Sequence, residues 1–495
     1  MSFGDVPLSR RRALGAALGS GVALAAAPVL AGCAPSKGAP ASPPSPIAQV
    51  AADGWDFTAN GKRFSVYGMN WMDPGTGYWP PRQWSDFSAT RVDQELAQVA
   101  SIGVDTIRVF VAATYFEPTP TAVSTQALKT MDTFLGIAER HGLRVQFTTP
   151  ADWEGTPSYR QPDKFAGTPN LDALRVYWTA VGKTFGDDER IFSWDLHNEG
   201  TINWTSSVMT QLWPQWLQTE YKTVSAVQEA WGSSGTLLSF IDAPVPSPNH
   251  PAAGSRFLYD YQRFRESVAE NFLQVQLDAL KSAGDKHLTT MGLIQWSIPL
   301  YLSQAVPSQY SGFDPVRVGK NLDYITFHFY PLLQDGLAVS DLSAWVEANI
   351  LYMKALAAYV ATGQGKKPRP VVVGEFGWPG SGAAGRGAAP FFQGVINATP
   401  KWFSGWMPWT YAVTPTHPRE WNLFNYPAGT LTPWGETYKE GRAALQGAAT
   451  AYPHAPVVKA PASPTFEDMV TNPNVQYLWE FAAAVGLGSP PSVVA

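Results

Sequence analysis

The sequence has a single cysteine in 495 residues, Cys33, so no disulfide can form within the chain. Charged residues make up only 15% of it, and the net charge of −5 leaves no basic excess for binding nucleic-acid phosphates. There is no glycine-rich phosphate loop, no Ser–His–Asp arrangement and no metal-ligand spacing, and the seven histidines are scattered. We therefore expect no nucleic-acid partner, no metal and no cofactor.

Apolar and aromatic residues are abundant. Hydrophobic residues make up 45% of the chain, which permits a large core, either one α/β barrel with additions or two to three ordinary domains. The 20 Trp, 19 Tyr and 25 Phe are unusually many. Aromatic faces can stack on the C–H faces of sugar rings, although packing in a core is their default use.

The N-terminal 32 residues have the pattern of a removable signal peptide. Ser9-Arg10-Arg11-Arg12-Ala13-Leu14 resembles a twin-arginine export motif, and Leu30-Ala31-Gly32-Cys33 resembles a lipobox. Lipid attachment to Cys33 would explain an unpaired cysteine in an exported protein; a transmembrane anchor or a free thiol are the alternatives. The Pro/Ser-rich stretch 33–50 is a tether. We expect an exported lipoprotein, at the cell surface or in the periplasm, that is anchored to the membrane through Cys33.

Strand-like apolar runs alternate with amphipathic helical patterns between residues 51 and 448. Eight repeats of this alternation predict a (β/α)8 TIM barrel, with a long insertion at 201–250 and a short C-terminal extension at 449–495. The expected strands are 64–70, 104–110, 143–149, 191–196, 288–295, 322–328, 370–375 and 403–409. The expected helices are 91–102, 124–141, 171–185, 257–283, 342–362, 385–396 and 434–447, with a further short one at 474–486.

Two glutamates stand at the C-terminal ends of predicted strands. Asn198-Glu199 follows the fourth strand, and Glu375 ends the seventh. Active sites of (β/α)8 barrels are built at these strand ends, and two facing carboxylates are the minimum for cleaving a glycosidic bond. Arg108, near the end of the second strand, is the cation expected to keep Glu375 ionised, and Asn198 could bind a sugar 2-hydroxyl. Structural ion pairs are the alternative for both glutamates.

Five stretches in this order are similar to the glycoside hydrolase clan of retaining (β/α)8 barrels, most of all to family 5, which contains cellulases and mannanases. The stretches are Gly103–Val109, Asn198-Glu199, His328–Pro331, Gly374–Gly377 and Gly405–Trp409. The resemblance implies that Glu199 is the acid/base and Glu375 the nucleophile, which Tyr330 contacts. It also implies that the subsite for the reacting sugar contains Arg108, His328 and Trp409.

The chain departs from this resemblance in two places. A histidine that many family members carry near the third strand is missing from the stretch Phe147–Trp153, where Trp153 is a candidate sugar contact. Asn70, Trp71 and Asp73, after the first strand, are further candidates. The segment 213–232 resembles an insertion of some β-galactosidases, and such a lid argues against endo action on a long polymer.

These observations predict a monomeric, retaining β-glycosidase of the cellulase or β-mannanase kind, acting on an oligo- or polysaccharide by double displacement. An exo-acting β-galactosidase or galactofuranosidase-like enzyme is one alternative. The other is a lipoprotein that binds glycans without cleaving them.

Overall fold

The computed structural model describes residues 49–77, 80–149, 157–160, 163–232, 237–246, 256–294, 297, 310–330, 346, 350, 353, 369–377, 388–413 and 422–451. The chain divides into two compact units, residues 1–43 and 44–495, and every described residue lies in the second. The predicted signal peptide, Cys33, Trp153, nearly all of the tether and of the C-terminal extension, and most of the predicted helix 342–362 lie outside the described residues.

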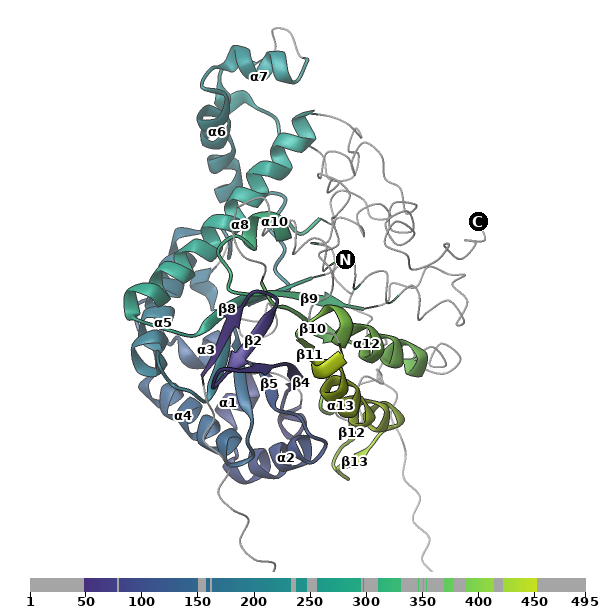
Figure 1. Cartoon of the computed structure of the whole chain (residues 1–495). Coiled ribbons are helices and arrows are strands. Elements are labelled where there is room, and N and C mark those ends of the chain that lie inside the picture. The colour runs from purple at the N-terminus through teal and green to yellow at the C-terminus, as the bar shows by residue number, and fades with distance from the viewer. Residues whose placement is uncertain are drawn as a thin grey trace, which may run out of the picture. The chain divides into compact units, whose positions relative to one another are not determined.

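Eight parallel strands close into a barrel, in the order β10-β11-β4-β5-β6-β7-β8-β9 (Figure 1). The strands are β4 (Val66–Trp71), β5 (Thr106–Phe110), β6 (Arg144–Thr148), β7 (Ile191–Asn198), β8 (Leu288–Leu293), β9 (Ile325–Phe329), β10 (Val371–Phe376) and β11 (Gly405–Trp406). The prediction of a (β/α)8 barrel is confirmed, and each expected strand overlaps one of these. Nearly every strand residue is buried, because helices cover one face and the barrel interior the other.

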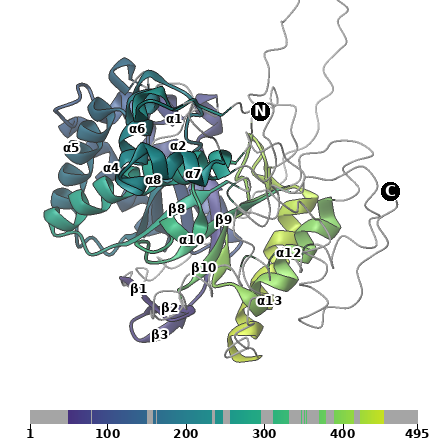
Figure 2. The ribbon, with the colours of Figure 1, turned by 90° about the horizontal axis from the view of Figure 1, so that it is seen from above.

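The helices that follow the strands lie where the sequence predicts them. They are α2 (Ala89–Ser101), α4 (Thr125–Arg140), α5 (Thr168–Phe185), α8 (Arg256–Ala283), α12 (Ala388–Trp402) and α13 (Pro433–Ala451). Ser88 and Ser124 cap α2 and α4 by accepting hydrogen bonds from backbone N–H groups of the first turn. In α2 the apolar residues Val92, Leu96 and Val99 form the buried stripe that packs on the barrel. Figure 2 shows α12 and α13 side by side.

An antiparallel sheet of three short strands, β1 (Val50–Asp53), β2 (Asp56–Ala59) and β3 (Lys62–Phe64), precedes the barrel. The sequence analysis did not predict it as a separate sheet, because most of its residues are polar or exposed. Phe57 of this sheet is fully buried and lies edge-on to Phe192 and Tyr324, at the beginnings of β7 and β9. The sheet therefore covers the N-terminal end of the barrel, away from the strand ends that carry the glutamates.

The insertion after β7 contains α6 (Ser207–Tyr221), α7 (Val224–Ala230) and the short helix η3 (Phe240–Asp242). Figure 1 shows α6 and α7 beside the N-terminal part of α8, beyond the ring of strands. Trp213 is buried there and stacks on Trp216 and Trp231 at 5.5 and 6.2 Å between ring centroids. Trp213 also packs on Tyr261 and Phe264 of α8, so the insertion joins the same hydrophobic core as the barrel.

Shorter elements complete the described chain: η1 (Pro74–Thr76), α1 (Pro80–Ser85), α3 (Ala113–Phe116), η2 (Ser158–Arg160), α10 (Pro315–Val318), β12 (Phe424–Asn425) and β13 (Thr430–Leu431). Among the described residues, no helix has the length and apolar character needed to cross a bilayer.

Candidate active site

Irregularities in the strands direct the two glutamates into the barrel mouth. The register of β7 against β8 shifts between Asp195 and Asn198, and that of β10 against β9 shifts between Val373 and Glu375. Such bulges bend a strand and re-aim the side chains that follow. Glu199 itself has a φ of 50°, in the left-handed region, a strained conformation for a non-glycine residue that is often found at active sites.

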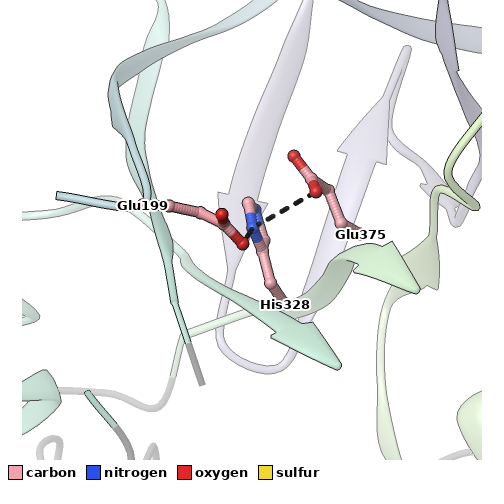
Figure 3. A group of neighbouring side chains, drawn as sticks. All are labelled: Glu199, His328 and Glu375. Carbon is pink, nitrogen blue, oxygen red and sulfur yellow. Dashed lines mark hydrogen bonds and ion pairs between the residues drawn. The ribbon is translucent and has the colours of Figure 1, made fainter. Parts of the chain in front are cut away.

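Glu199, His328 and Glu375 meet at this point, with one ligand atom of each within 4.8 Å of the others (Figure 3). His328 Nδ1 is hydrogen-bonded to Glu199 Oε1 at 2.8 Å and lies 3.6 Å from Glu375 Oε2. The Glu199 side chain keeps 29% of its surface exposed, whereas that of Glu375 keeps 5%. The two carboxylates are therefore close together, and one of them is the more accessible to solvent.

Arg108 is completely buried and links four groups of the site. Its Nη1 donates to Glu375 Oε1 at 2.5 Å and to Asn70 Oδ1 at 2.9 Å. Its Nη2 donates to Asn198 Oδ1 at 2.7 Å, and its Nε donates to Asp195 Oδ2 at 2.8 Å. Because Arg108 occupies Asn198 Oδ1, the amide nitrogen of Asn198 is the donor left for a substrate hydroxyl. Asp195 holds the guanidinium in place.

Burial and neighbouring charges act in opposite directions on Glu375. Burial raises the pKa of its carboxyl above the ordinary value, while His328, Arg108 and the Tyr330 hydroxyl lower it. The ion pair with Arg108 is the one predicted from the sequence, but its effect is smaller than that of burial. Burial lowers the pKa of His328 to about 4, so the imidazole is neutral at pH 7. A neutral His328 can donate its Nδ1–H to Glu199 Oε1 while the other oxygen of Glu199 carries a proton.

Tyr330 contacts Glu375 as the resemblance implies, whereas the place of Trp409 in the sugar subsite stays a prediction. The Tyr330 hydroxyl donates to Glu375 Oε2 at 2.8 Å. Trp409 packs edge-on against Phe110 at 5.6 Å, in a small apolar cluster with Met72. Tyr330, which is hydrogen-bonded to Glu375, packs against this cluster, and an apolar cluster suits the C–H face of a sugar ring.

The three candidates after the first strand make hydrogen bonds or ion pairs within the protein. Asn70 is fully buried, and its amide nitrogen donates to the carbonyls of Gly374, Met407 and Pro408 while its oxygen accepts from Arg108. Trp71 donates from Nε1 to Glu95, and the Asp73 carboxylate pairs with Arg91. All three side chains are buried and engaged within the protein, and a contact between any of them and a substrate stays a prediction.

Gly292, which was not predicted from the sequence to matter, makes room for His328, and Gly374 makes room for Thr326 beside it. A Cβ at Gly292 would lie 2.7 Å from His328 Nε2 and 3.0 Å from Arg108 Nη2. A Cβ at Gly374 would lie 3.4 Å from His328 Nε2 and 2.1 Å from Thr326 Cγ2. A glycine inside an apolar strand is the available signal, since it often marks a close approach of another group.

The same three side chains could in principle ligate a cation, because each offers one ligand atom to the group. A bound cation would, however, hold both carboxylates as ligands and remove them from acid/base chemistry. The expectation of no metal therefore stays a prediction, and we consider the pair as reacting groups.

Comparison with known proteins relates the chain to sugar-cleaving enzymes. Residues 157–375, less than half of the chain, match the model of the Glyco_hydro_42 family, described as beta-galactosidase. The β-galactosidase YesZ of Bacillus subtilis (strain 168) is 24% identical over 161 residues, which are 31% of this chain and 22% of that protein. BgaH of Haloferax lucentense is 23% identical over 295 residues, 52% of this chain and 40% of that β-galactosidase. The chain thus spans well under half of the length of these relatives.

Solved structures share the fold. The cold-adapted β-galactosidase of Rahnella sp. R3 aligns with a TM-score of 0.62 and 14% identity, over 81% of this chain and 58% of that one. GH5_18 of Streptomyces cattleya, solved with Manβ1-4GlcNAc, aligns with a TM-score of 0.57 and 17% identity. The alignment covers 86% of this chain and 92% of that one. At the level these comparisons support, the chain is related to glycoside hydrolases on (β/α)8 barrels. The family 5 resemblance is matched in the fold, whereas the family model belongs to β-galactosidases.

Proposed function

We propose that this protein is a retaining β-glycosidase. The observation that carries the proposal is the approach of Glu199 and Glu375, whose ligand atoms lie within 4.8 Å at the C-terminal ends of β7 and β10. Carboxyl groups of retaining enzymes are about 5–5.5 Å apart, whereas inverting enzymes need about 6.5–9.5 Å to admit a water molecule. The separation supports direct attack by one carboxylate on the sugar.

The roles follow from the surroundings of each carboxyl group. Glu375, ion-paired with Arg108, attacks the anomeric carbon and forms a glycosyl ester as the C–O bond to the leaving group breaks. Glu199 gives its proton to the leaving oxygen, and is then the base that takes a proton from the water that hydrolyses the ester. Its greater exposure suits this exchange of protons with incoming water.

A terminal β-galactoside is the favoured substrate. The family model and the curated relatives are β-galactosidases, and the model's match contains Glu199 and Glu375. A β-mannoside is the second candidate, because the structural neighbours include GH5_18 with Manβ1-4GlcNAc and an exo-β-1,4-mannosidase of an Opitutaceae bacterium with a TM-score of 0.51. Both candidate substrates favour exo action, the release of a terminal sugar, over the endo cleavage of a cellulase or mannanase.

The test compares turnover of aryl β-galactosides with turnover of aryl β-mannosides. ¹H NMR follows which anomer of the free sugar is released first. We expect turnover of one series, a β-anomer as the first product, and loss of on the order of 10⁴-fold or more in rate for Glu375→Ala. Glu139→Gln, on the exposed face of α4, is the matched control. An α-anomer as the first product would refute retention, and sugar that is bound but never consumed would favour the glycan-binding alternative.

We also propose that the protein is a membrane-anchored lipoprotein, which rests on the motif ending in Cys33. Replacing Cys33 by Ala should move the protein from the membrane fraction to the soluble fraction. Unchanged membrane association in that variant would instead favour a transmembrane anchor.

A further inference from the structure

The loop that begins with Glu199 is held tightly at its first two residues. The Glu199 N–H donates to the carbonyl of Gly292 at 2.9 Å, and Gly200 packs so closely that a Cβ there would lie 2.7 Å from Phe313. With Glu199 in the left-handed region, the direction of its side chain depends on how the following residues are fixed. The acid/base carboxyl is thus positioned by contacts beyond its own strand.

The fixed point in this loop is Ile202. Its side chain is buried, and its N–H donates to the carbonyl of Ser311 at 2.7 Å. Its carbonyl accepts a hydrogen bond of 2.6 Å from Nη2 of Arg265, a residue of α8. The guanidinium carbon of Arg265 also lies 5.0 Å from the ring centroid of Trp204, which is two residues after Ile202. One guanidinium therefore contacts the loop twice.

Arg265 is an unusual cation in this fold. It is 1% exposed, and its described contacts include no carboxylate within ion-pair distance. Nη1 donates to the neutral Gln262 side chain at 2.6 Å, and Nε has no hydrogen-bond partner among the described residues. Burying a guanidinium without a counter-ion is unfavourable, and burial accordingly lowers the pKa of Arg265 to about 10. If Arg265 only filled space, an apolar side chain at this position would be more favourable in free energy than a buried guanidinium.

We propose that Arg265 is a positioning residue for the acid/base Glu199. It fastens the loop 199–204 to α8, the helix that follows the insertion, through the carbonyl of Ile202 and the ring of Trp204. This inference rests on the proposed function for the role of Glu199, but the fastening of the loop does not.

The predicted kinetic signature depends on the leaving group. A misplaced acid slows departure of a poor leaving group that needs the proton, and barely affects one that leaves unprotonated. For Arg265→Met we expect kcat/KM to fall about 10²-fold on a phenyl β-glycoside and by less than about threefold on the 2,4-dinitrophenyl glycoside of the same sugar. Arg265→Lys, which keeps one donor and the charge, should recover part of the loss. The matched control is Arg263→Met, two residues away on α8 and paired with Glu266 instead.

Hydrogen–deuterium exchange of the peptide containing residues 199–204 tests the loop without relying on activity. We expect exchange there to become at least about tenfold faster in Arg265→Met and to stay unchanged in Arg263→Met. Unchanged exchange in Arg265→Met would overturn the proposal, as would equal losses of kcat/KM on the two substrates. If the wild type cleaves neither substrate nor any aryl glycoside, the proposed function fails, while faster exchange would still support the fastening of the loop.

Discussion

Replacing Glu95 by Gln should change how the stability of the barrel depends on pH. Glu95 is a buried carboxyl on α2, 3% exposed, that accepts one hydrogen bond from Trp71 Nε1 at 3.1 Å. Its other oxygen has no hydrogen-bond partner among the described residues. Burial, aided by the charge of Asp73 and opposed by Arg91, raises its pKa from 4.5 to about 9. Glu95 is therefore protonated in the folded protein at pH 7 and ionised in the unfolded chain.

The sign and size of the effect follow from linkage. Between pH 4.5 and about 9 the folded state holds one proton more than the unfolded state, so the free energy of unfolding falls as pH rises. The slope contributed by Glu95 is about −1.4 kcal/mol per pH unit, or about 2.7 kcal/mol between pH 6 and pH 8. Glutamine keeps an oxygen for Trp71 and does not titrate, so the variant lacks this contribution.

Urea unfolding followed by tryptophan fluorescence at pH 6, 7 and 8 measures the difference. The free energy of unfolding of Glu95→Gln relative to wild type should rise by about 2.7 kcal/mol over that range. Glu139→Gln, at an exposed position of α4, should show no such trend. If the free energies of unfolding of wild type and Glu95→Gln depended on pH in the same way, the conclusion that Glu95 is a neutral carboxyl in the folded protein would be refuted.

Three further changes test the site itself. Arg108→Met should lower the free energy of unfolding by about 3–5 kcal/mol in urea, because it leaves buried carboxylates without their partner; a loss below about 1 kcal/mol would contradict this. Tyr330→Phe removes a hydrogen bond that lowers the pKa of Glu375, so the acidic limb of the kcat/KM profile should move to higher pH; a shift to lower pH would count against it. Gly292→Ala should reduce kcat/KM at least about tenfold, because the new methyl displaces His328, and wild-type kinetics in that variant would show that the ring has room to move.

The local pattern of the chain was enough to predict the barrel. Each strand is a short apolar run that must be buried on both faces, so its position can be recognised without knowing its neighbours. The same reasoning placed Glu199 and Glu375 at the catalytic end, because they directly follow such runs. The N-terminal sheet was not predicted, since its strands carry no comparable apolar pattern apart from Phe57.

Contacts between distant segments were decided by the tertiary structure alone. Arg108 and Glu375 are 267 positions apart. Nothing local indicates that Asn70 links Arg108 to the carbonyls of Gly374 and Met407. Likewise, only the tertiary structure shows that α8 contacts the loop after Glu199, through the hydrogen bond from Arg265 to the carbonyl of Ile202. Periodicity and strand-end chemistry are properties of neighbours along the chain, so the sequence determined the architecture and the position of Glu199 and Glu375 at the C-terminal ends of two strands. The hydrogen bonds that orient that pair depend on the closure of the ring of strands, and only folding brings their partners together.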